Sequence, residues 1–276
     1  MVQQQPNRPT PFREIDRTPP EMAALILAAL DSMARNPEIQ RVRAVALDAL
    51  RPVPGQRLLD AGAGLGEVAR GLAAAVAPGG EVVALDFSAA AVSAAAGRHD
   101  GSAVRYLTGD VTGLAFPDAA FDGVRCERVL QHLTEPDRAV AELTRVTRAG
   151  GRVCLIDTDW ESAALDGLPA DLVTAVRTHL LARTFEHRAD MGRTLRRRLV
   201  GAGLADVTAV PVTCCFLDPA AAADVLVMVN PRVPWEAGFL PEELYEPWFA
   251  AIEDAGRRGE FLAALTIWVA AGTRPG

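Results

Sequence analysis

Apolar residues recur with two different spacings along the chain. Between residues 19 and 50 they recur at helical spacing, which predicts two helices, at 19–35 and 36–50. Further on, short apolar runs alternate with helical segments. The runs predict strands at 57–60, 81–85, 104–107, 121–126 and 152–156, and the segments between them predict helices at 67–77, 88–98 and 135–148. Such alternation predicts βαβ units on a mostly parallel sheet.

The pattern is looser after Asp157. It predicts helices at 169–184, 191–202, 218–230 and 241–256, with strands at 207–216 and 261–270. We therefore expect a Rossmann-like, doubly wound α/β fold with a mostly parallel seven-stranded sheet, N-terminal helices and a helical lid. Residues 19–276 are expected to form a single domain whose cap elements lie at about 19–50, 160–200 and 218–258. Residues 1–18 are polar and rich in proline, and an extended or poorly ordered arm is expected there.

Composition narrows the choice of partners. Half of the residues are hydrophobic and 23% are charged, as in globular proteins. The formal net charge of -7 disfavours nucleic acid as a partner, because an acidic chain repels phosphates. The arginines at 193 and 196–198 are interpreted as the solvated face of a helix. Four cysteines without a C-x-x-C pair suit neither a zinc site nor a disulfide framework. The sequence shows neither a signal peptide nor a membrane span, and a cytoplasmic protein without membrane contact is expected.

A glycine-rich turn follows the first predicted strand. The segment Asp60-Ala61-Gly62-Ala63-Gly64-Leu65-Gly66 precedes a helix, and its glycines allow a tight turn and the close approach of a ligand. Asp86 ends the second strand and Asp110 follows the third. Three acids at the carboxyl ends of three strands line the crevice where open α/β sheets bind ligands.

The glycine spacing separates two classes of cofactor. Dinucleotide-binding proteins carry G-x-G-x-x-G and place a pyrophosphate on the helix. Here the spacing is G-x-G-x-G, with Asp60 before the turn and Glu67 after it. Acids at these positions repel a pyrophosphate and suit a sulfonium or an ammonium group, so a dinucleotide oxidoreductase is disfavoured.

Several segments in order resemble class I S-adenosylmethionine-dependent methyltransferases. They are D-A-G-A-G-L-G at 60–66, Leu85-Asp86, Gly109-Asp110, F-D-G-V at 121–124, V-L-Q-H-L at 129–133 and G-G-R-V at 150–153. The pattern is similar to the ubiquinone/menaquinone-biosynthesis branch (methyltransferase type 11) and covers roughly residues 40–160. The resemblance implies S-adenosyl-L-methionine as cofactor and S-adenosyl-L-homocysteine as product.

The resemblance also implies a role for each matching position. The residues implied in cofactor binding are Asp60, Ala61, Gly62 and Gly64 at the methionine part, Asp86 at the ribose, Phe87 beside the adenine, Gly109, Asp110 and Val111 around the adenine amino group, and Glu127 at the same crevice. Asp110 taken alone equally fits a turn acid. Arg41 or Arg43 can reach the methionine carboxylate, or lie on the surface.

His132 is the candidate catalytic base, because it follows the fourth strand and imidazole titrates near neutral pH. A histidine that merely packs at the start of a helix is the alternative. His187 and Asp190 are candidates for an acceptor-side pair, against a loop of solvated charges. The aromatic residues of the expected lid suit either an acceptor pocket or a small core; they are Trp160, Phe185, Trp235, Phe239, Tyr245 and Trp248.

The expected function is methyl transfer to the oxygen, nitrogen or carbon of a small-molecule acceptor, in a setting such as secondary metabolism. The acidic charge and the lid disfavour a macromolecular acceptor. A protein of this fold that binds the cofactor but catalyses another reaction, such as cyclisation, stays open, because a fold does not fix a function. The sequence offers no metal-ligand constellation, and it leaves the choice between monomer and homodimer open.

Overall fold

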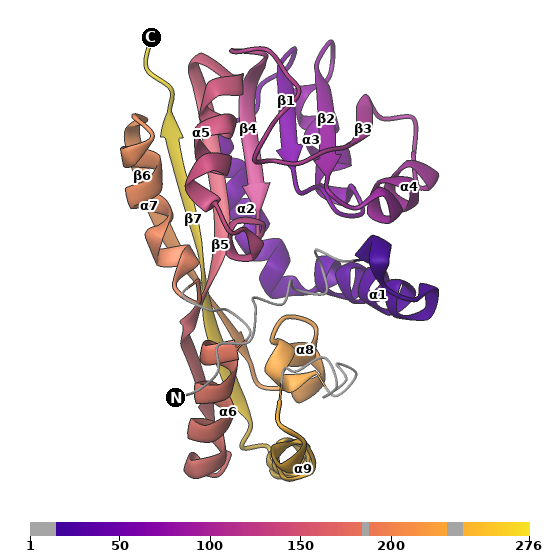
Figure 1. Ribbon diagram of the computed structural model, residues 1–276, viewed down its shortest axis with the longest axis vertical. Helices are drawn as coiled ribbons and strands as arrows, with labels where there is room; N and C mark the ends of the chain where they lie inside the picture. The colour runs from indigo at the N-terminus through magenta and orange to yellow at the C-terminus, as the bar shows by residue number, and fades with distance from the viewer. Residues whose placement is uncertain (1–14, 184–187, 231–239) are drawn as a thin grey trace.

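The computed structural model describes residues 15–183, 188–230 and 240–276. Within these residues seven strands form one sheet in the order β3-β2-β1-β4-β5-β7-β6 (Figure 1). The strands are β1 (Arg57–Ala61), β2 (Glu81–Asp86), β3 (Val104–Thr108), β4 (Phe121–Glu127), β5 (Thr147–Asp166), β6 (Ala205–Phe216) and β7 (Leu262–Thr273). The first five are parallel, while β7 runs antiparallel to both β5 and β6. The expected doubly wound, mostly parallel seven-stranded sheet is confirmed.

Helices cover both faces of the sheet. They are α1 (Pro20–Arg35), α2 (Pro37–Leu50), α3 (Glu67–Val76), α4 (Ala89–Gly97), α5 (Pro136–Val146), α6 (Ala170–Arg183), α7 (Met191–Gly201), α8 (Pro219–Ala223) and α9 (Glu242–Arg258). One hydrophobic core contains the buried residues of α2 and α3, and a second core, on the other face, contains those of α5 and α7 (Figure 1). The sheet is thus buried on both faces, as a parallel sheet requires.

Helix α2 illustrates how the sequence defines an element. Asn36 caps its first turn, because the side-chain oxygen accepts a hydrogen bond from the Glu38 N–H at 3.0 Å, and Pro37 occupies the first helical position. Its buried residues, Ile39, Val42, Ala46 and Leu50, recur every three or four positions. This single apolar stripe packs α2 against the sheet.

Strand β5 is much longer than predicted. The apolar pattern predicted residues 152–156 alone, whereas β5 runs to Asp166 and pairs with β7 over most of that length. The polar residues Asp157, Thr158 and Asp159 ended the predicted strand, but all three are buried. Asp159 is neutralised by Arg193 of α7, whose guanidinium donates two hydrogen bonds to its carboxylate, at 2.5 and 2.6 Å. The ion pair with α7 offsets the cost of burying the Asp159 charge, so the strand can run on through this polar segment.

Two further expectations need correction. The helix predicted at 218–230 is broken into α8 and the 3-10 helix η4 (Val227–Val229). Residues 15–17, expected to belong to an extended arm, form the 3-10 helix η2 (Ile15–Arg17), and Ile15 is buried. Residues 1–14 of that arm lie outside the described residues.

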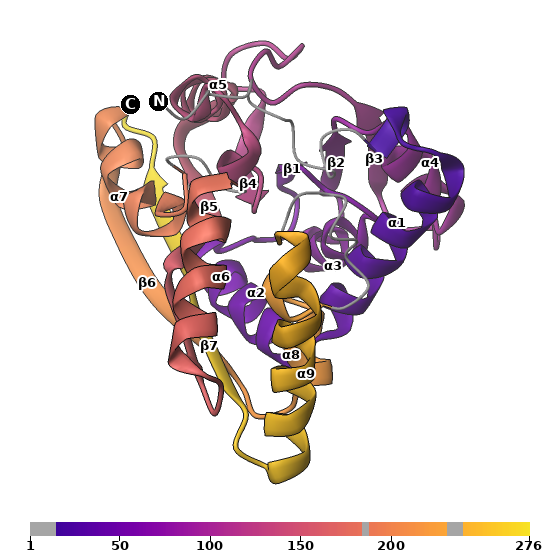
Figure 2. The ribbon, with the colours of Figure 1, turned by 60° about the horizontal axis from the view of Figure 1, so that its bottom comes forward.

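The carboxyl ends of the parallel strands face the cap helices. Figure 1 shows α1 crossing beneath β1, β2 and β3, with α6, α8 and α9 further down beside the extended halves of β5 and β7. Figure 2 brings α8 and α9 forward and shows α9 lying along this end of the molecule. No described helix has both the length and the apolarity needed to cross a membrane.

Candidate functional site

The glycine-rich turn joins β1 to α3 at the carboxyl edge of the sheet. Gly62, Gly64 and Gly66 have φ angles of 79°, 53° and 73°, a region that disfavours other residues. A Cβ at Gly62 would lie 2.1 Å from Cγ2 of Val129, so the turn packs tightly on the loop that follows β4. A Cβ at Gly64 would meet no atom within 4 Å. The backbone at Gly64 therefore borders open space that a ligand can enter.

Asp86 fixes this turn in place. Its Oδ2 accepts a hydrogen bond from the Gly64 N–H at 2.8 Å, and its Oδ1 accepts one from the Ser88 N–H at 3.0 Å. Burial raises the pKa of Asp86, while these two backbone bonds oppose the rise. The Phe87 N–H also acts on this carboxylate, which has about four acceptor sites, so the side chain can still accept a hydrogen bond from a ligand hydroxyl.

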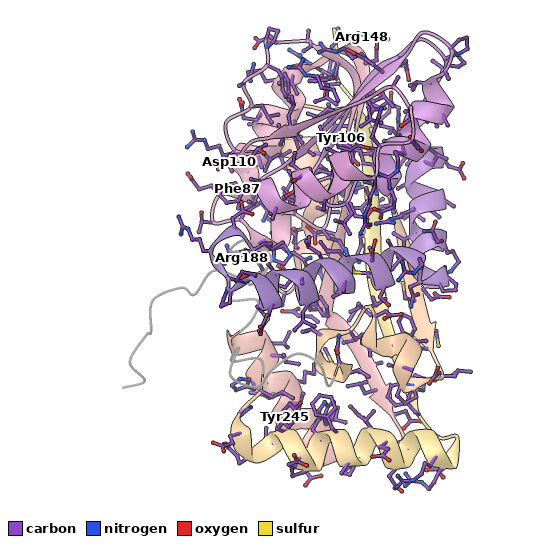
Figure 3. The ribbon with its side chains drawn as sticks, turned by 90° about the vertical axis from the view of Figure 1, so that its right-hand side faces the viewer. Phe87, Tyr106, Asp110, Arg148, Arg188 and Tyr245 are labelled. Carbon is purple, nitrogen blue, oxygen red and sulfur yellow. The ribbon has the colours of Figure 1, made fainter. Side chains whose placement is uncertain are left out.

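Phe87, which follows Asp86 in the chain, and Asp110 lie close together (Figure 3). The Gly109 N–H donates to the Asp86 carbonyl at 2.9 Å, which holds the loop after β3 against the loop after β2. The Phe87 side chain is 52% exposed, and Val111 is buried behind the loop. Oδ1 of Asp110 accepts bonds from the backbone N–H of Thr112 at 2.8 Å and from its hydroxyl at 2.7 Å. Asp110 thus shapes a turn, and its contact with an adenine stays a prediction.

Behind the glycine turn lies a network of buried charges. The register of the parallel strands sets Arg125 of β4 beside Asp60 of β1, and Arg125 Nη1 donates to Asp60 Oδ1 at 2.9 Å. Nη2 of the same guanidinium donates to Glu127. Arg43 of α2 donates to Glu127 at 3.2 Å and to Glu67 at 2.7 Å. Acids from three elements are thus joined by two arginines.

The network revises the electrostatic argument made for Asp60. Its carboxylate is fully buried and paired with Arg125, so it presents no bare negative charge to the crevice. Burial raises the pKa of Asp60, and Arg125 opposes that rise. Burial would also raise the pKa of Glu127, but Arg125 and Arg43 outweigh it and lower the pKa to about 2. Glu127 therefore stays ionised, beside the ends of β1 and β4.

One buried acceptor in this network still lacks a donor. Asp60 Oδ2 has no hydrogen-bond partner among the described residues. An unpaired buried oxygen costs free energy unless a donor reaches it. An ammonium group or a water bound to one would satisfy it. This orphan oxygen and the open space at Gly64 fit the methionine end of the predicted cofactor.

The loop after β4 carries His132, in the 3-10 helix η3 (Leu130–His132). The His132 side chain is half-buried, and its backbone N–H donates to the Val129 carbonyl at 2.9 Å. Beside it, the Gln131 N–H donates to Asp157 Oδ2 at 3.1 Å. The position agrees with a base at the crevice, and the catalytic role of His132 stays a prediction.

Sequence reasoning missed two buried residues of this site, Arg125 and Asp157. Burial raises the pKa of Asp157 to about 7, even though it accepts backbone N–H bonds. Asp157 directly follows the parallel-paired part of β5, much as Asp60 and Asp86 lie at or next to the ends of β1 and β2, and this repeated position was the signal available in the sequence. For Arg125 the signal was a single cation within an apolar strand.

Other candidates are placed elsewhere. Arg41 turns away from the crevice and donates to the Thr213 carbonyl of β6, whereas Arg43 reaches the buried network. Asp190 stands at the start of α7. His187, Phe185, Trp235 and Phe239 lie outside the described residues. Among the described residues no cluster of His, Cys, Asp and Glu could hold a metal ion.

The lid aromatics divide between two roles. Trp248 of α9 is fully buried, and its Nε1 donates to the Met228 carbonyl at 2.6 Å, so it belongs to the core of the lid. Tyr245 packs on Phe249 in the same helix, with 4.8 Å between ring centroids. Figure 3 shows Tyr245 on α9, well away from Phe87 and Asp110. Trp160 lines a cavity instead.

Comparison with known proteins gives one family. The family model described as "Methyltransferase domain" matches residues 59–155. An uncharacterized 37.1 kDa protein of a Streptomyces fradiae transposon is 36% identical over 242 residues, which cover 87% of this chain and 69% of that protein. The demethylmenaquinone methyltransferase of Renibacterium salmoninarum is 34% identical over 52% of this chain and 61% of its own length. The chain thus matches less than two thirds of that enzyme.

Solved structures share the fold at low sequence identity. A phosphoethanolamine N-methyltransferase of Haemonchus contortus, solved with S-adenosyl-L-methionine, superposes with a TM-score of 0.62 at 17% identity, covering 96% of this chain and 60% of that one. The [4+2]-cyclase SpnF superposes with a TM-score of 0.59 at 20% identity, covering 98% of both chains. These likenesses show the architecture alone.

Proposed function

Because this chain belongs to the class I S-adenosylmethionine-dependent methyltransferases, in the ubiquinone/menaquinone-biosynthesis branch, we propose that it methylates a small-molecule acceptor enclosed beneath its lid. The observation that carries the proposal is the junction of Asp86 with the glycine turn. There a carboxylate held by the Gly64 and Ser88 N–H groups borders the open space at Gly64. Such a junction orients a ribose beside the turn.

The cofactor, when bound, would supply a methyl group on a sulfonium: the acceptor atom would bond to the methyl carbon in line as the carbon–sulfur bond breaks, and S-adenosylhomocysteine would leave as a neutral thioether. The side chains of this protein orient the reactants and exclude water, and such positioning contributes much of the rate in transfers of this kind. Asp86 would hold the ribose hydroxyls, Phe87 would cover the adenine, and Asp60 Oδ2 would accept from the methionine end. His132 would take the proton from an oxygen or carbon acceptor, while an acceptor amine that arrives neutral needs no base.

Two observations favour a small acceptor. The helices α6, α8 and α9 lie beyond the carboxyl edge of the sheet, where they would limit the size of a bound molecule (Figure 2). The formal net charge of -7 opposes a nucleic acid. The names of two relatives in this branch describe methyltransferases of demethylmenaquinone and of 2-phytyl-1,4-naphthoquinone, which are quinones and not macromolecules.

The test begins with calorimetric titration of the purified chain with S-adenosylmethionine, S-adenosylhomocysteine and NAD. We expect binding of both sulfur compounds and none of NAD. Failure of both sulfur compounds to bind the folded protein would refute the proposal. Incubation with methyl-labelled cofactor and a panel of hydroxylated aromatic compounds should then give one S-adenosylhomocysteine for each labelled product. An unlabelled, cyclised product would instead favour a non-methylating enzyme.

The role of His132 is tested by comparing His132→Ala with His99→Ala, a change at an exposed position after α4. For an oxygen or carbon acceptor, His132→Ala should lower kcat by about a hundredfold or more and remove the acidic limb of the pH–rate profile. Full turnover in His132→Ala would exclude a base at that position.

A further inference from the structure

Helix α1, with η2 before it, crosses beneath β1, β2 and β3 at the carboxyl edge of the sheet (Figure 1). We propose that Asp16 of η2 is a positioning residue for cofactor binding, which holds the turn after β2 so that the Asp86 carboxylate meets the ribose. This inference rests on the proposed function, because it adds a residue to the cofactor side of the same site. It also gives a role to part of the segment that was expected to be an extended arm.

Asp16 caps a helix that begins 73 residues further along the chain. Its Oδ2 accepts a hydrogen bond from the Ala89 N–H at 2.8 Å, and its Oδ1 accepts one from the Ala90 N–H at 3.0 Å. The next N–H of α4, at Ala91, donates to Ser88 Oγ at 3.1 Å. These first-turn donors have no acceptor within the helix, so a distant carboxylate satisfies two of them. Its negative charge also suits the positive end of the helix dipole.

Ser88 connects this cap to the cofactor site. Its hydroxyl donates to Asp16 Oδ1 at 2.7 Å, while its backbone N–H donates to Asp86 Oδ1 at 3.0 Å. The other oxygen of Asp86 accepts from the Gly64 N–H at 2.8 Å. A continuous series of hydrogen bonds therefore runs from Asp16 to the glycine turn. Loss of the Asp16 carboxylate would loosen the start of α4 and, with it, the carboxylate assigned to the ribose.

The turn that presents Asp16 is itself well supported. Ile15, which precedes Asp16, is only 4% exposed, so its side chain anchors η2 in the protein. Thr18 donates its backbone N–H and its hydroxyl to the Ile15 carbonyl, at 3.2 and 2.8 Å, and these two bonds close the turn. Asp16 is therefore held on a defined turn before the cofactor binds, and the support that it gives to α4 is built into the fold.

A second contact joins the same segment to the opposite end of α4. Asp31 of α1 accepts two hydrogen bonds from the Arg98 guanidinium, at 2.5 and 2.8 Å, and Arg98 directly follows the last residue of α4. This pair tethers α1 to α4 at the end away from the turn at 86–90. The two aspartates thus separate tethering of the segment, to which both contribute, from support of the turn, which the proposal assigns to Asp16.

Calorimetric titration of the full chain with S-adenosylhomocysteine tests the proposal, with Asp31→Ala as the matched control. We expect Asp16→Ala to weaken binding about threefold to tenfold, because the bound state must then also order the turn. Asp16→Asn keeps one side-chain oxygen as an acceptor and should recover part of that loss. Asp31→Ala should bind like the wild type, because its tether lies at the other end of α4.

A double variant separates positioning from a general structural role. If Asp16 acts through Asp86, its position no longer matters once the Asp86 carboxylate is gone. Asp16→Ala combined with Asp86→Ala should therefore bind S-adenosylhomocysteine no more weakly than Asp86→Ala alone. A structural role that is independent of Asp86 would instead make the two losses add.

Amide hydrogen exchange, followed by mass spectrometry without cofactor, measures the support of the turn directly. Exchange within residues 86–91 should be at least severalfold faster in Asp16→Ala than in the wild type, because two N–H groups lose their acceptor. Asp31→Ala should leave this segment unchanged. Equal exchange within 86–91 in Asp16→Ala and the wild type would overturn the proposal.

The binding results keep this inference distinct from the proposed function. If the wild type binds S-adenosylhomocysteine but Asp16→Ala binds it equally well, or if Asp31→Ala is weakened as much, the positioning role fails and the methyltransferase proposal stands. Additive losses in the double variant would overturn the positioning role in the same way. If the wild type does not bind S-adenosylhomocysteine at all, the proposed function fails, and the role of Asp16 fails with it.

Discussion

Replacing Arg125 by methionine would remove the guanidinium that joins Asp60 to Glu127 behind the glycine turn. The Arg125 side chain is 4% exposed, and those of Asp60 and Glu127 are 1% and 6% exposed. Methionine fills a similar volume but leaves the Asp60 carboxylate without its partner. Removing one member of a buried ion pair costs about 3–5 kcal/mol, because the remaining charge stays desolvated. For a chain of this size, that corresponds to a fall in Tm of about 6–20 °C.

The assay is urea unfolding followed by circular dichroism, with Arg148→Met as the matched control. Arg148 also pairs with an aspartate, Asp122 at 2.5 Å, but its side chain is 49% exposed (Figure 3). Exposed pairs contribute about 0–1 kcal/mol, so Arg148→Met should stay close to the wild type. Adding Asp60→Asn to Arg125→Met should recover part of the loss. If Arg125→Met were no less stable than Arg148→Met, the buried network would not support the fold as argued.

Three other changes have defined outcomes. Asp86→Ala should lower the affinity for S-adenosylhomocysteine about tenfold or more, because hydrogen bonds to a carboxylate are lost. The control Asp100→Ala, in an exposed turn, should bind like the wild type, and equal affinities in the two variants would exclude the ribose contact. Gly62→Ala should destabilise the folded protein more than Gly55→Ala. Both glycines have a positive φ, but only a Cβ at Gly62 would collide with Val129. Equal urea midpoints for the two variants would contradict the tight packing. Asp157→Asn should remove a pH dependence of stability. Burial raises the pKa of Asp157 in the folded protein to about 7, from 3.8, so between these pH values the folded state binds a proton that the unfolded state has lost. The stability of the wild type should therefore fall by up to about 1.4 kcal/mol per pH unit as the pH rises through this window, and then level off. Urea unfolding between about pH 5 and pH 8 measures that slope, and an unchanged slope in Asp157→Asn would show that Asp157 is not its source.

The parallel half of the fold was predictable because its signals are local. A buried strand, a glycine turn and a helix follow one another at β1 and α3, and Asp86 ends β2 at the position expected. Strand β5 was cut short because the pattern cannot show that Arg193, far along the chain, neutralises Asp159. The break between α8 and η4 could not be predicted, because residues 220–229 contain no proline or glycine that would mark the end of a helix.

The site was predictable in its acids but not in its cations. Acids at strand ends stand out from the apolar residues before them, and Asp60 and Asp86 lie at the edge that this position implied. Arg125 and Arg43 come from β4 and α2, which meet the acids only after the sheet has formed. Tertiary contacts between distant segments therefore decided the charge of the crevice. The roles of His132 and Asp110 toward a ligand stay predictions.

The order of the strands also constrains the synthesis of the chain on the ribosome. Strand β7, near the end of the sequence, lies between β5 and β6, and among the described strands β6 pairs only with β7. While the chain emerges, β1 to β5 can pair with one another, but β6 leaves the exit tunnel without a neighbour and waits for β7. The glycine turn and Asp86 can thus assemble before the sheet that supports α6 and α9. The nascent protein completes the enclosing end of the molecule last.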